Sequence, residues 1–199
     1  MNDHIARWNS ASKCFDLANV GIERRYGKYK RELFTKCQGK VLLVAAGTGL
    51  DFPYFPEGLE ITAIDFSPKM VEKAREKMGG YSGKLEVVEA DVMSLDFPGK
   101  SFDTVATSCT FCSVPDPVKG LKEIYRVLKP HGRLLMFEHV RAGAMPLGAM
   151  MDIMTPLFRK FGPEINRRTG ANVRKAGFTI TREYNVYLDM VKLFEAVRP

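Results

Sequence analysis

The chain has 199 residues, of which 45% are hydrophobic and 27% are charged. This length and composition predict one globular domain around a single core, and they exclude an intrinsically disordered protein. No run of about 18 apolar residues is present, and residues 1–10 carry charges where a signal peptide needs an apolar stretch, so we expect neither secretion nor membrane insertion. Four cysteines are too few for a disulfide scaffold, which favours a reducing cytoplasm.

The net charge of +7 is concentrated in two parts of the chain. Residues 1–40 hold nine Lys and Arg against four Asp and Glu, and residues 141–175 hold seven against two. Localised positive charge predicts an anionic partner surface, for which nucleic acid, an acidic membrane and an anionic substrate are the candidates. A solvated basic face without a partner is the alternative.

Between residues 40 and 140, short apolar runs alternate with amphipathic segments. The apolar runs predict five strands, over residues 40–46, 59–64, 85–88, 102–108 and 133–140. Ser67 followed by Pro68 predicts the start of a helix, and the apolar spacing over 116–129 predicts another, which a proline and a glycine end. This alternation predicts βαβ crossovers and a mostly parallel sheet with helices on both faces.

Two of these strand ends predict a nucleoside cofactor. Ligands of a parallel sheet bind beyond the carboxyl ends of its strands. The first strand ends in the small residues 45–49, including Gly47 and Gly49, which let a ligand approach the backbone and let a following helix present its amide groups. The second strand ends at Asp65, eighteen positions after Gly47, and an acid at that distance accepts hydrogen bonds from ribose hydroxyls.

The residues that follow distinguish between nucleoside cofactors. A dinucleotide fingerprint needs glycine at the position of Phe52, and Asp51 would repel a pyrophosphate. S-adenosylmethionine has a cationic sulfonium and a zwitterionic tail, so it meets no such repulsion. Asp91, at the end of the third strand, is placed to accept the adenine amino group, with the Val92 amide beside it. One such acid alone is also typical of a helix cap or a turn.

Five motifs resemble, in order, those of class I S-adenosylmethionine-dependent methyltransferases: VLLVAAGTG at 41–49, ITAIDFSP at 61–68, EADVM at 89–93, SFD at 101–103 and YRVLKPHGR at 125–133. The resemblance covers most of the chain. It implies a Rossmann-like α/β fold, with a mostly parallel seven-stranded sheet, helices on both faces and one antiparallel strand. One position departs, because family members usually carry Asp or Glu where this chain has Leu43.

The same resemblance implies S-adenosylmethionine as cofactor, S-adenosylhomocysteine as product, and no metal. Asp65 would bind the ribose, Asp91 and Val92 the adenine, and residues 107–113 would lie beside the sulfur. The implied cofactor-binding residues are Ala45, Ala46, Gly47, Thr48, Gly49, Asp65, Phe66, Met70, Asp91, Val92, Met93 and Ser108.

The resemblance also implies that residues 1–199 form a single methyltransferase domain with four parts. Residues 1–38 are expected to be a helical cover, 39–140 the cofactor-binding core, 141–170 an insert over the substrate, and 171–199 the end of the sheet. In the last two parts, a helix is predicted over 166–176 and strands over 178–186 and 190–197.

Shorter motifs resemble three groups within the family. Residues 47–56, 137–140 and 166–169 resemble bacterial phospholipid N-methyltransferases. Phe15 and the residues after it resemble ubiquinone and menaquinone-biosynthesis methyltransferases, which have Tyr at this position. Residues 112–114 and 138–140 resemble membrane-associated thiol S-methyltransferases. We therefore expect an amphiphilic acceptor, first the amine of phosphatidylethanolamine, with small thiols and quinone precursors as alternatives.

The insert combines an apolar face with positive charge. Apolar residues recur at helical spacing from Leu147 to Phe161, Pro156 predicts a break or kink, and basic residues follow. This combination is typical of a segment at an anionic membrane surface, so we expect a cytoplasmic protein peripheral to the inner face of the membrane; core packing is the alternative. The residues expected to contact substrate or membrane are Trp8, Phe15, Arg24, Arg25, Met150, Met154, Arg167 and Arg168.

Methyl transfer needs an aligned nucleophile and a group that takes its proton. His139, at the end of the fifth strand, is the predicted general base and Glu138 the second candidate; a buried structural histidine is the alternative. Cys109 and Cys112 are expected to pack or line the substrate channel.

A nucleic-acid methyltransferase would also explain the positive charge. The fourth strand ends without the Asn/Asp-Pro-Pro-aromatic tetrad suited to a flipped base, so a lipid and not a nucleic acid is the expected partner. A module that binds S-adenosylmethionine without catalysis is the alternative outside the enzymes.

Overall fold

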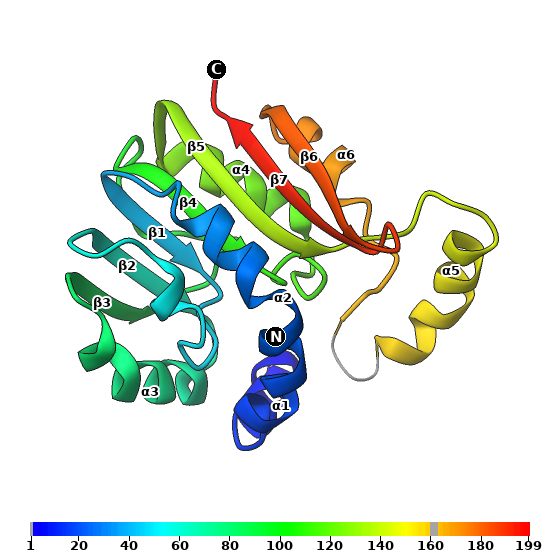
Figure 1. The fold of residues 1–199 in the computed structure, drawn as a ribbon, viewed down its shortest axis with the longest axis horizontal. Coiled ribbons are helices and arrows are strands. Elements are labelled where there is room, and N and C mark those ends of the chain that lie inside the picture. Colours follow the sequence, from blue (N-terminus) through cyan, green and yellow to red (C-terminus); the bar gives the residue numbers. More distant parts are fainter. Residues whose placement is uncertain (1, 160–162) are drawn as a thin grey trace.

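The computed structural model describes residues 2–159 and 163–199, which form a seven-stranded sheet between layers of helices (Figure 1). The strand order is β3-β2-β1-β4-β5-β7-β6. Neighbouring strands are parallel except at β7, which runs antiparallel to both β5 and β6. The predicted fold with one antiparallel strand is confirmed. The strands are β1 (Lys40–Val44), β2 (Glu60–Asp65), β3 (Lys84–Glu89), β4 (Phe102–Ser108), β5 (Leu128–His139), β6 (Thr179–Tyr187) and β7 (Val191–Val197).

Helices bury both faces of the central strands. Helices α2 (Phe15–Phe34) and α3 (Pro68–Lys77) pack on one face, and α4 (Pro117–Val127) and α6 (Thr169–Lys175) pack on the other. Every side chain of β1 from Val41 to Val44 is therefore at most 1% exposed. This two-sided burial explains why the strand reads as a continuous apolar run and not as an alternating one.

Two predicted helix starts are confirmed by their caps. The Ser67 hydroxyl accepts a hydrogen bond from the Met70 amide (3.3 Å), and the Asp116 carboxylate accepts one from the Lys119 amide (3.0 Å). A proline follows each cap at the first helical position, where its missing N–H costs nothing. These caps fix where α3 begins directly after β2 and where α4 begins after the loop that follows β4.

Several boundaries differ from the sequence-based expectation. Helix α4 ends at Val127 instead of residue 129, and β5 begins at Leu128 instead of residue 133. Leu128 pairs with Phe102 of β4, and the register shifts before the next pair, Thr104 with Arg133. The proline and the glycine that were predicted to end the helix therefore lie within β5, between these two pairs. Strand β1 ends at Val44 because the next residue has φ of +56°. Helix α6 begins three residues later than predicted.

The α-helix expected after the glycine loop is not formed. The chain forms only the 3₁₀ turn η1 (Phe52–Tyr54) before it reaches β2. Pro56 lies two residues after this turn and has no N–H to continue a helix. The loop amides therefore do not continue into the first turn of an α-helix.

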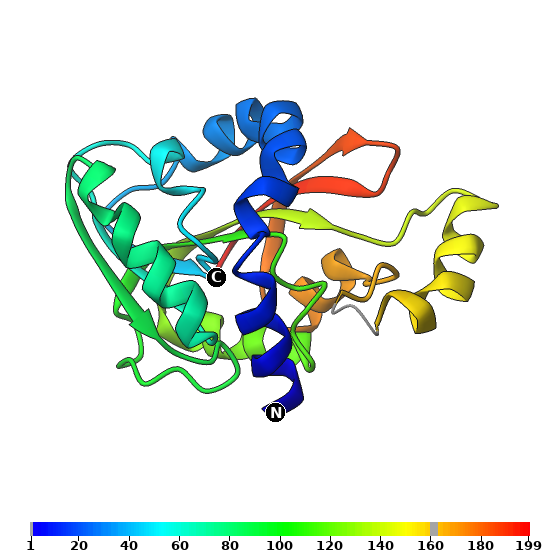
Figure 2. The ribbon, with the colours of Figure 1, turned by 90° about the horizontal axis from the view of Figure 1, so that it is seen from below.

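Helix α5 (Leu147–Phe158) stands away from the sheet at the end of an extended connection (Figures 1 and 2). It continues through Pro156 for two more residues, so the predicted break does not occur there. Pro156 lies in the last turn, where the amide of Arg159 still bonds to the carbonyl of Thr155 (2.8 Å). Phe161 lies outside the described residues. None of the described helices is long and apolar enough to cross a bilayer.

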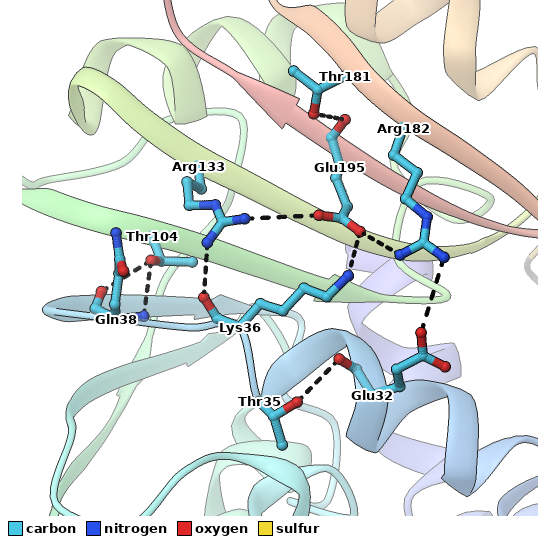
Figure 3. Close-up of polar contacts among 9 residues, drawn as sticks. All are labelled: Glu32, Thr35, Lys36, Gln38, Thr104, Arg133, Thr181, Arg182 and Glu195. Atoms are coloured by element: carbon cyan, nitrogen blue, oxygen red, sulfur yellow. Dashed lines mark hydrogen bonds and ion pairs between the residues drawn. The ribbon is translucent and has the colours of Figure 1, made fainter.

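A cluster of charges holds the end of α2 against the sheet (Figure 3). Glu195 of β7 accepts from Lys36 (2.5 Å) and Arg182 (3.2 Å), and its second oxygen lies 3.7 Å from Arg133. Arg182 also reaches Glu32 of α2, at 4.0 Å. Burial alone would raise the pKa of Glu195, but its cationic neighbours lower it. The cluster fixes the N-terminal cover relative to the strands.

Candidate active site

A cavity of about 640 Å³ lies at the carboxyl ends of the parallel strands, and helices α1 (Asn2–Ala11) and α2 and the end of α5 contribute to its walls. This volume is within the range of small-molecule sites. Ten of the twelve predicted cofactor residues line it: Ala45, Ala46, Gly47, Asp65, Phe66, Met70, Asp91, Val92, Met93 and Ser108. Thr48 and Gly49 do not line it.

The glycine loop is shaped by its own contacts. The Gly49 amide donates to the Ala46 carbonyl (2.9 Å), and a Cβ at Gly49, where φ is +82°, would lie 2.6 Å from the Phe52 ring. Thr48 is buried, and its hydroxyl donates to Asp16 of α2. Gly49 and Thr48 therefore maintain the loop, and other residues of the loop face the cavity.

Asp65 connects the glycine loop to the start of α3. Its carboxylate oxygens accept from the amides of Gly47 and Ser67, both at 2.9 Å. Burial raises the pKa of Asp65 to about 6, although these backbone hydrogen bonds act in the opposite direction. A buried carboxylate facing a cavity, with lone pairs left over, suits the hydroxyls of a ribose.

The end of β3 supplies the next part of the wall. Asp91 accepts from the Met93 amide (2.8 Å) in a tight turn closed by an isolated bridge to Ser94. Asp91, Val92 and Met93 all line the cavity. The turn contact is the local role that the sequence also allowed, and it leaves Asp91 with acceptor capacity towards the cavity.

Glu138 does not line the cavity, so its position does not fit the role of a second base. Its carboxylate is fully buried and accepts from the Thr107 hydroxyl (2.7 Å) and the amides of Thr110 (3.2 Å) and Phe111 (3.1 Å). Glu138 therefore anchors the loop after β4, and it is this loop that lines the cavity. Burial raises the pKa of this carboxyl to about 7, against the lowering effect of the three hydrogen bonds.

We expect the stability of the wild type relative to Glu138→Gln to fall as the pH rises. The pKa of Glu138 in the folded protein lies above its usual value of 4.5, so ionisation costs more in the folded state. The stabilising contribution is present below pH 4.5 and is lost as the pH rises through about 7. Urea titrations measure the unfolding free energy of both proteins. From pH 5 to pH 8, the value for the wild type should fall by about 2–3 kcal/mol relative to that for Glu138→Gln. An unchanged difference would contradict the buried position.

His139 is the predicted base that the structure does place in the cavity wall. Burial lowers its pKa from the usual value, which favours the neutral imidazole. Cys109 and Cys112 also line the cavity, and burial raises the pKa of both thiols. Protonated thiols are poor nucleophiles, which agrees with their expected role in lining the channel.

The predicted substrate and membrane residues fall into two groups. Trp8 and Phe15 line the cavity, with their ring centroids 6.4 Å apart in an edge contact. The other six lie outside the lining: Arg24, Arg25, Met150, Met154, Arg167 and Arg168. Arg167 donates to a backbone carbonyl of the loop after β4 (2.8 Å), and Arg25 lies 4.0 Å from the centre of a tyrosine ring of β6. These two arginines therefore have structural contacts within the protein.

A charged cluster in the cavity wall was not predicted from the sequence. Glu23 and Lys30 of α2 and Asp51 of the loop before η1 all line the cavity, and Lys30 forms an ion pair with each of the two acids. Glu23 and Lys30 are seven residues apart, which places them on one face of a helix, and this spacing was the available signal.

Comparisons with known proteins agree with this geometry. A family profile described as a methyltransferase domain matches residues 42–136. The phosphatidylethanolamine N-methyltransferase of Cereibacter sphaeroides is 36% identical over 114 residues, which cover 56% of this chain and 56% of that protein. The demethylmenaquinone methyltransferase of Deinococcus radiodurans is 31% identical over 167 residues, 80% of this chain and 66% of that protein. The chain thus spans about half to two thirds of the curated relatives it matches.

A solved S-adenosylmethionine-dependent methyltransferase from Aquifex aeolicus has the same fold. It superposes with a TM-score of 0.72 at 23% identity, over 94% of this chain and 98% of the other. The sheet order, the cavity at the strand ends and the matched sequence segment all point to one family. The chain therefore belongs to the class I S-adenosylmethionine-dependent methyltransferases.

Proposed function

We propose that this protein transfers the methyl group of S-adenosylmethionine to an amphiphilic acceptor at a membrane surface, specifically the amine of a phosphatidylethanolamine-type phospholipid. The observation that carries this proposal is the exposed apolar side of α5, which ends at the cavity. Ile153 is 79% exposed, Leu157 is 55% exposed, and the adjacent Phe158 lines the cavity. Exposed apolar surface beside a site indicates contact with an apolar partner.

The start of α2 supports the same proposal from another side of the cavity. Leu17 is 79% exposed and Val20 is 49% exposed, whereas Phe15 and Ile22 line the cavity. Exposed basic residues accompany both apolar surfaces, Arg24 on α2 and Arg168 after α5. Apolar side chains beside positive charge favour the surface of an anionic membrane, where a lipid acceptor would enter the cavity.

The wall of the cavity fits S-adenosylmethionine in its chemistry. Gly47 allows close approach to the backbone, and Asp65 and Asp91 offer acceptors for ribose hydroxyls and for the adenine amino group. When bound, the cofactor supplies an electrophilic methyl group on a sulfonium. The protein then has to align the acceptor, exclude water and remove one proton.

His139 is the residue that we propose takes this proton. The lone pair of the acceptor nitrogen forms the new N–C bond, the electron pair of the broken S–C bond stays on sulfur, and the nitrogen loses a proton. Because burial lowers the pKa of His139, its imidazole is neutral near pH 7 and can accept that proton. Its place in the cavity wall supports this role.

C-methylation of a quinone precursor is the second candidate function. The demethylmenaquinone methyltransferase aligns with 80% of this chain, whereas the phospholipid enzyme aligns with 56%. Quinone precursors with isoprenoid tails are also amphiphiles, so the same cavity and the same apolar helix would serve them.

Methyl-labelled S-adenosylmethionine distinguishes the acceptors directly. The purified protein is incubated with vesicles of phosphatidylethanolamine and phosphatidylglycerol, and with control vesicles in which phosphatidylcholine replaces phosphatidylethanolamine. We expect label in mono- and dimethylated phosphatidylethanolamine from the first vesicles only. No lipid label, in a preparation that binds S-adenosylhomocysteine, would overturn the phospholipid acceptor. Label in a demethylated quinone or a small thiol added to the same vesicles would establish the alternative.

A further inference from the structure

The cluster of Glu23, Lys30 and Asp51 places a buried cation in the wall of the cavity. The Lys30 ammonium donates to Glu23 (2.7 Å) and to Asp51 (2.9 Å), and Lys30 is only 5% exposed. The second oxygen of Glu23 accepts from the Tyr54 hydroxyl (2.7 Å). Although burial alone would lower the pKa of Lys30, the two carboxylates raise it, so the ammonium stays charged.

One N–H of Lys30 and one carboxylate oxygen of Asp51 remain available to hydrogen-bond a ligand. An ammonium has three protons, and within residues 2–159 and 163–199 the Nζ of Lys30 has only the two carboxylates as hydrogen-bond acceptors. In the same part of the chain, Oδ2 of Asp51 has no hydrogen-bond partner. Lys30 and Asp51 both line the cavity. One cationic donor and one anionic acceptor are thus available side by side.

Two amides of the neighbouring glycine loop are already bonded within the protein. The Gly47 amide is bonded to Asp65, the Gly49 amide to Ala46, and the chain continues into a 3₁₀ turn without an α-helical N-terminus. At position 43, where an acid is usual in the family, Leu43 is fully buried in the core beneath α2. Beside this loop, Lys30 and Asp51 therefore supply charges that the two bonded amides and Leu43 do not.

We propose that Lys30 and Asp51 form the binding site for the α-amino-acid end of S-adenosylmethionine. The free N–H of Lys30 donates to the α-carboxylate, and the free oxygen of Asp51 accepts from the α-ammonium. Glu23, which Tyr54 orients, holds Lys30 in place and is a positioning residue. This inference rests on the proposed function. Family members usually carry an acid at position 43, where this chain has Leu43. Here α2 and the loop before η1 would recognise the amino-acid end of the cofactor instead.

Two ligands that differ in the amino-acid end test the assignment. S-adenosylhomocysteine carries this end, and 5′-methylthioadenosine lacks it. By isothermal titration calorimetry, Lys30→Met should weaken S-adenosylhomocysteine about 10- to 100-fold and leave 5′-methylthioadenosine within about twofold. Asp51→Asn, which keeps the pair of Lys30 with Glu23, should show the same selectivity with a loss of about tenfold. Lys28→Met, at an exposed lysine of the same helix, should change neither affinity.

The outcomes separate this inference from the proposed function. The assignment would be overturned if the two variants lost the same affinity for both ligands, or lost affinity for neither. Binding by the wild type would still support the cofactor in that case. Failure of the wild type to bind either ligand would instead overturn the proposed function. If Lys30→Met does not fold, the test depends on Asp51→Asn. This variant removes one charge but keeps the ion pair between Lys30 and Glu23.

Discussion

Replacing Asp65 with Asn is expected to weaken S-adenosylhomocysteine binding by about a thousandfold. We expect the carboxylate to accept two charge-assisted hydrogen bonds from the ribose hydroxyls, each contributing about 1.5–3 kcal/mol. Asn offers one carbonyl oxygen in place of two carboxylate oxygens. Its amide group also faces the amide of Gly47 or Ser67, so that one of these donors loses its acceptor. Calorimetric titration with S-adenosylhomocysteine measures the effect.

A matched control for Asp65 lies on the neighbouring strand. Glu89, at the end of β3, is the registered partner of Asp65 but is exposed and lies outside the cavity lining. Glu89→Gln should therefore bind S-adenosylhomocysteine as the wild type does. A loss of less than about tenfold in Asp65→Asn, with the circular dichroism of the wild type retained, would contradict a ribose contact by Asp65.

The sequence predicted the central sheet and much of the cavity because those features depend on local patterns. Ser67 and Asp116 are caps whose side chains bond three residues ahead, and such contacts can be read from neighbouring letters. Asp65 lies at a strand end, and in a parallel sheet all the strand ends that bind ligands meet at one edge. Position in the sequence was enough to place it in the cavity wall.

The sequence could not predict features that depend on which elements meet in space. Lys30 reads as an exposed helical lysine until α2 packs beside the loop that carries Asp51, and only then does it become a buried cation. Glu138 reads as a candidate base because it adjoins His139. Side chains alternate along a strand, so His139 lines the cavity while Glu138 binds the loop after β4. Neighbouring residues in a strand therefore have opposite roles.

The other large effect is expected at α5, where Ile153→Glu with Leu157→Glu should reduce vesicle binding by about a thousandfold. Burying one large aliphatic side chain in the membrane interface contributes about 1.5–3 kcal/mol, and two such contributions are lost together. The new carboxylates also repel anionic lipid. Co-sedimentation with vesicles of phosphatidylethanolamine and phosphatidylglycerol measures the partition. Ile153→Leu with Leu157→Met keeps the surface apolar and should bind as the wild type does.

The membrane contact proposed for α5 can be tested apart from catalysis, because Ile153 and Leu157 do not line the cavity. The double glutamate variant should therefore bind S-adenosylhomocysteine normally and should methylate a water-soluble short-chain phosphatidylethanolamine at the wild-type rate, while its rate on vesicles falls with the loss of binding. Equal losses on both substrates would show that α5 supports the site itself. Ile153 and Leu157 are, at 79% and 55%, among the most exposed apolar side chains of the described residues, so a membrane contact of α5 would have to involve them. Vesicle binding that is not reduced in the double glutamate variant would therefore contradict this contact.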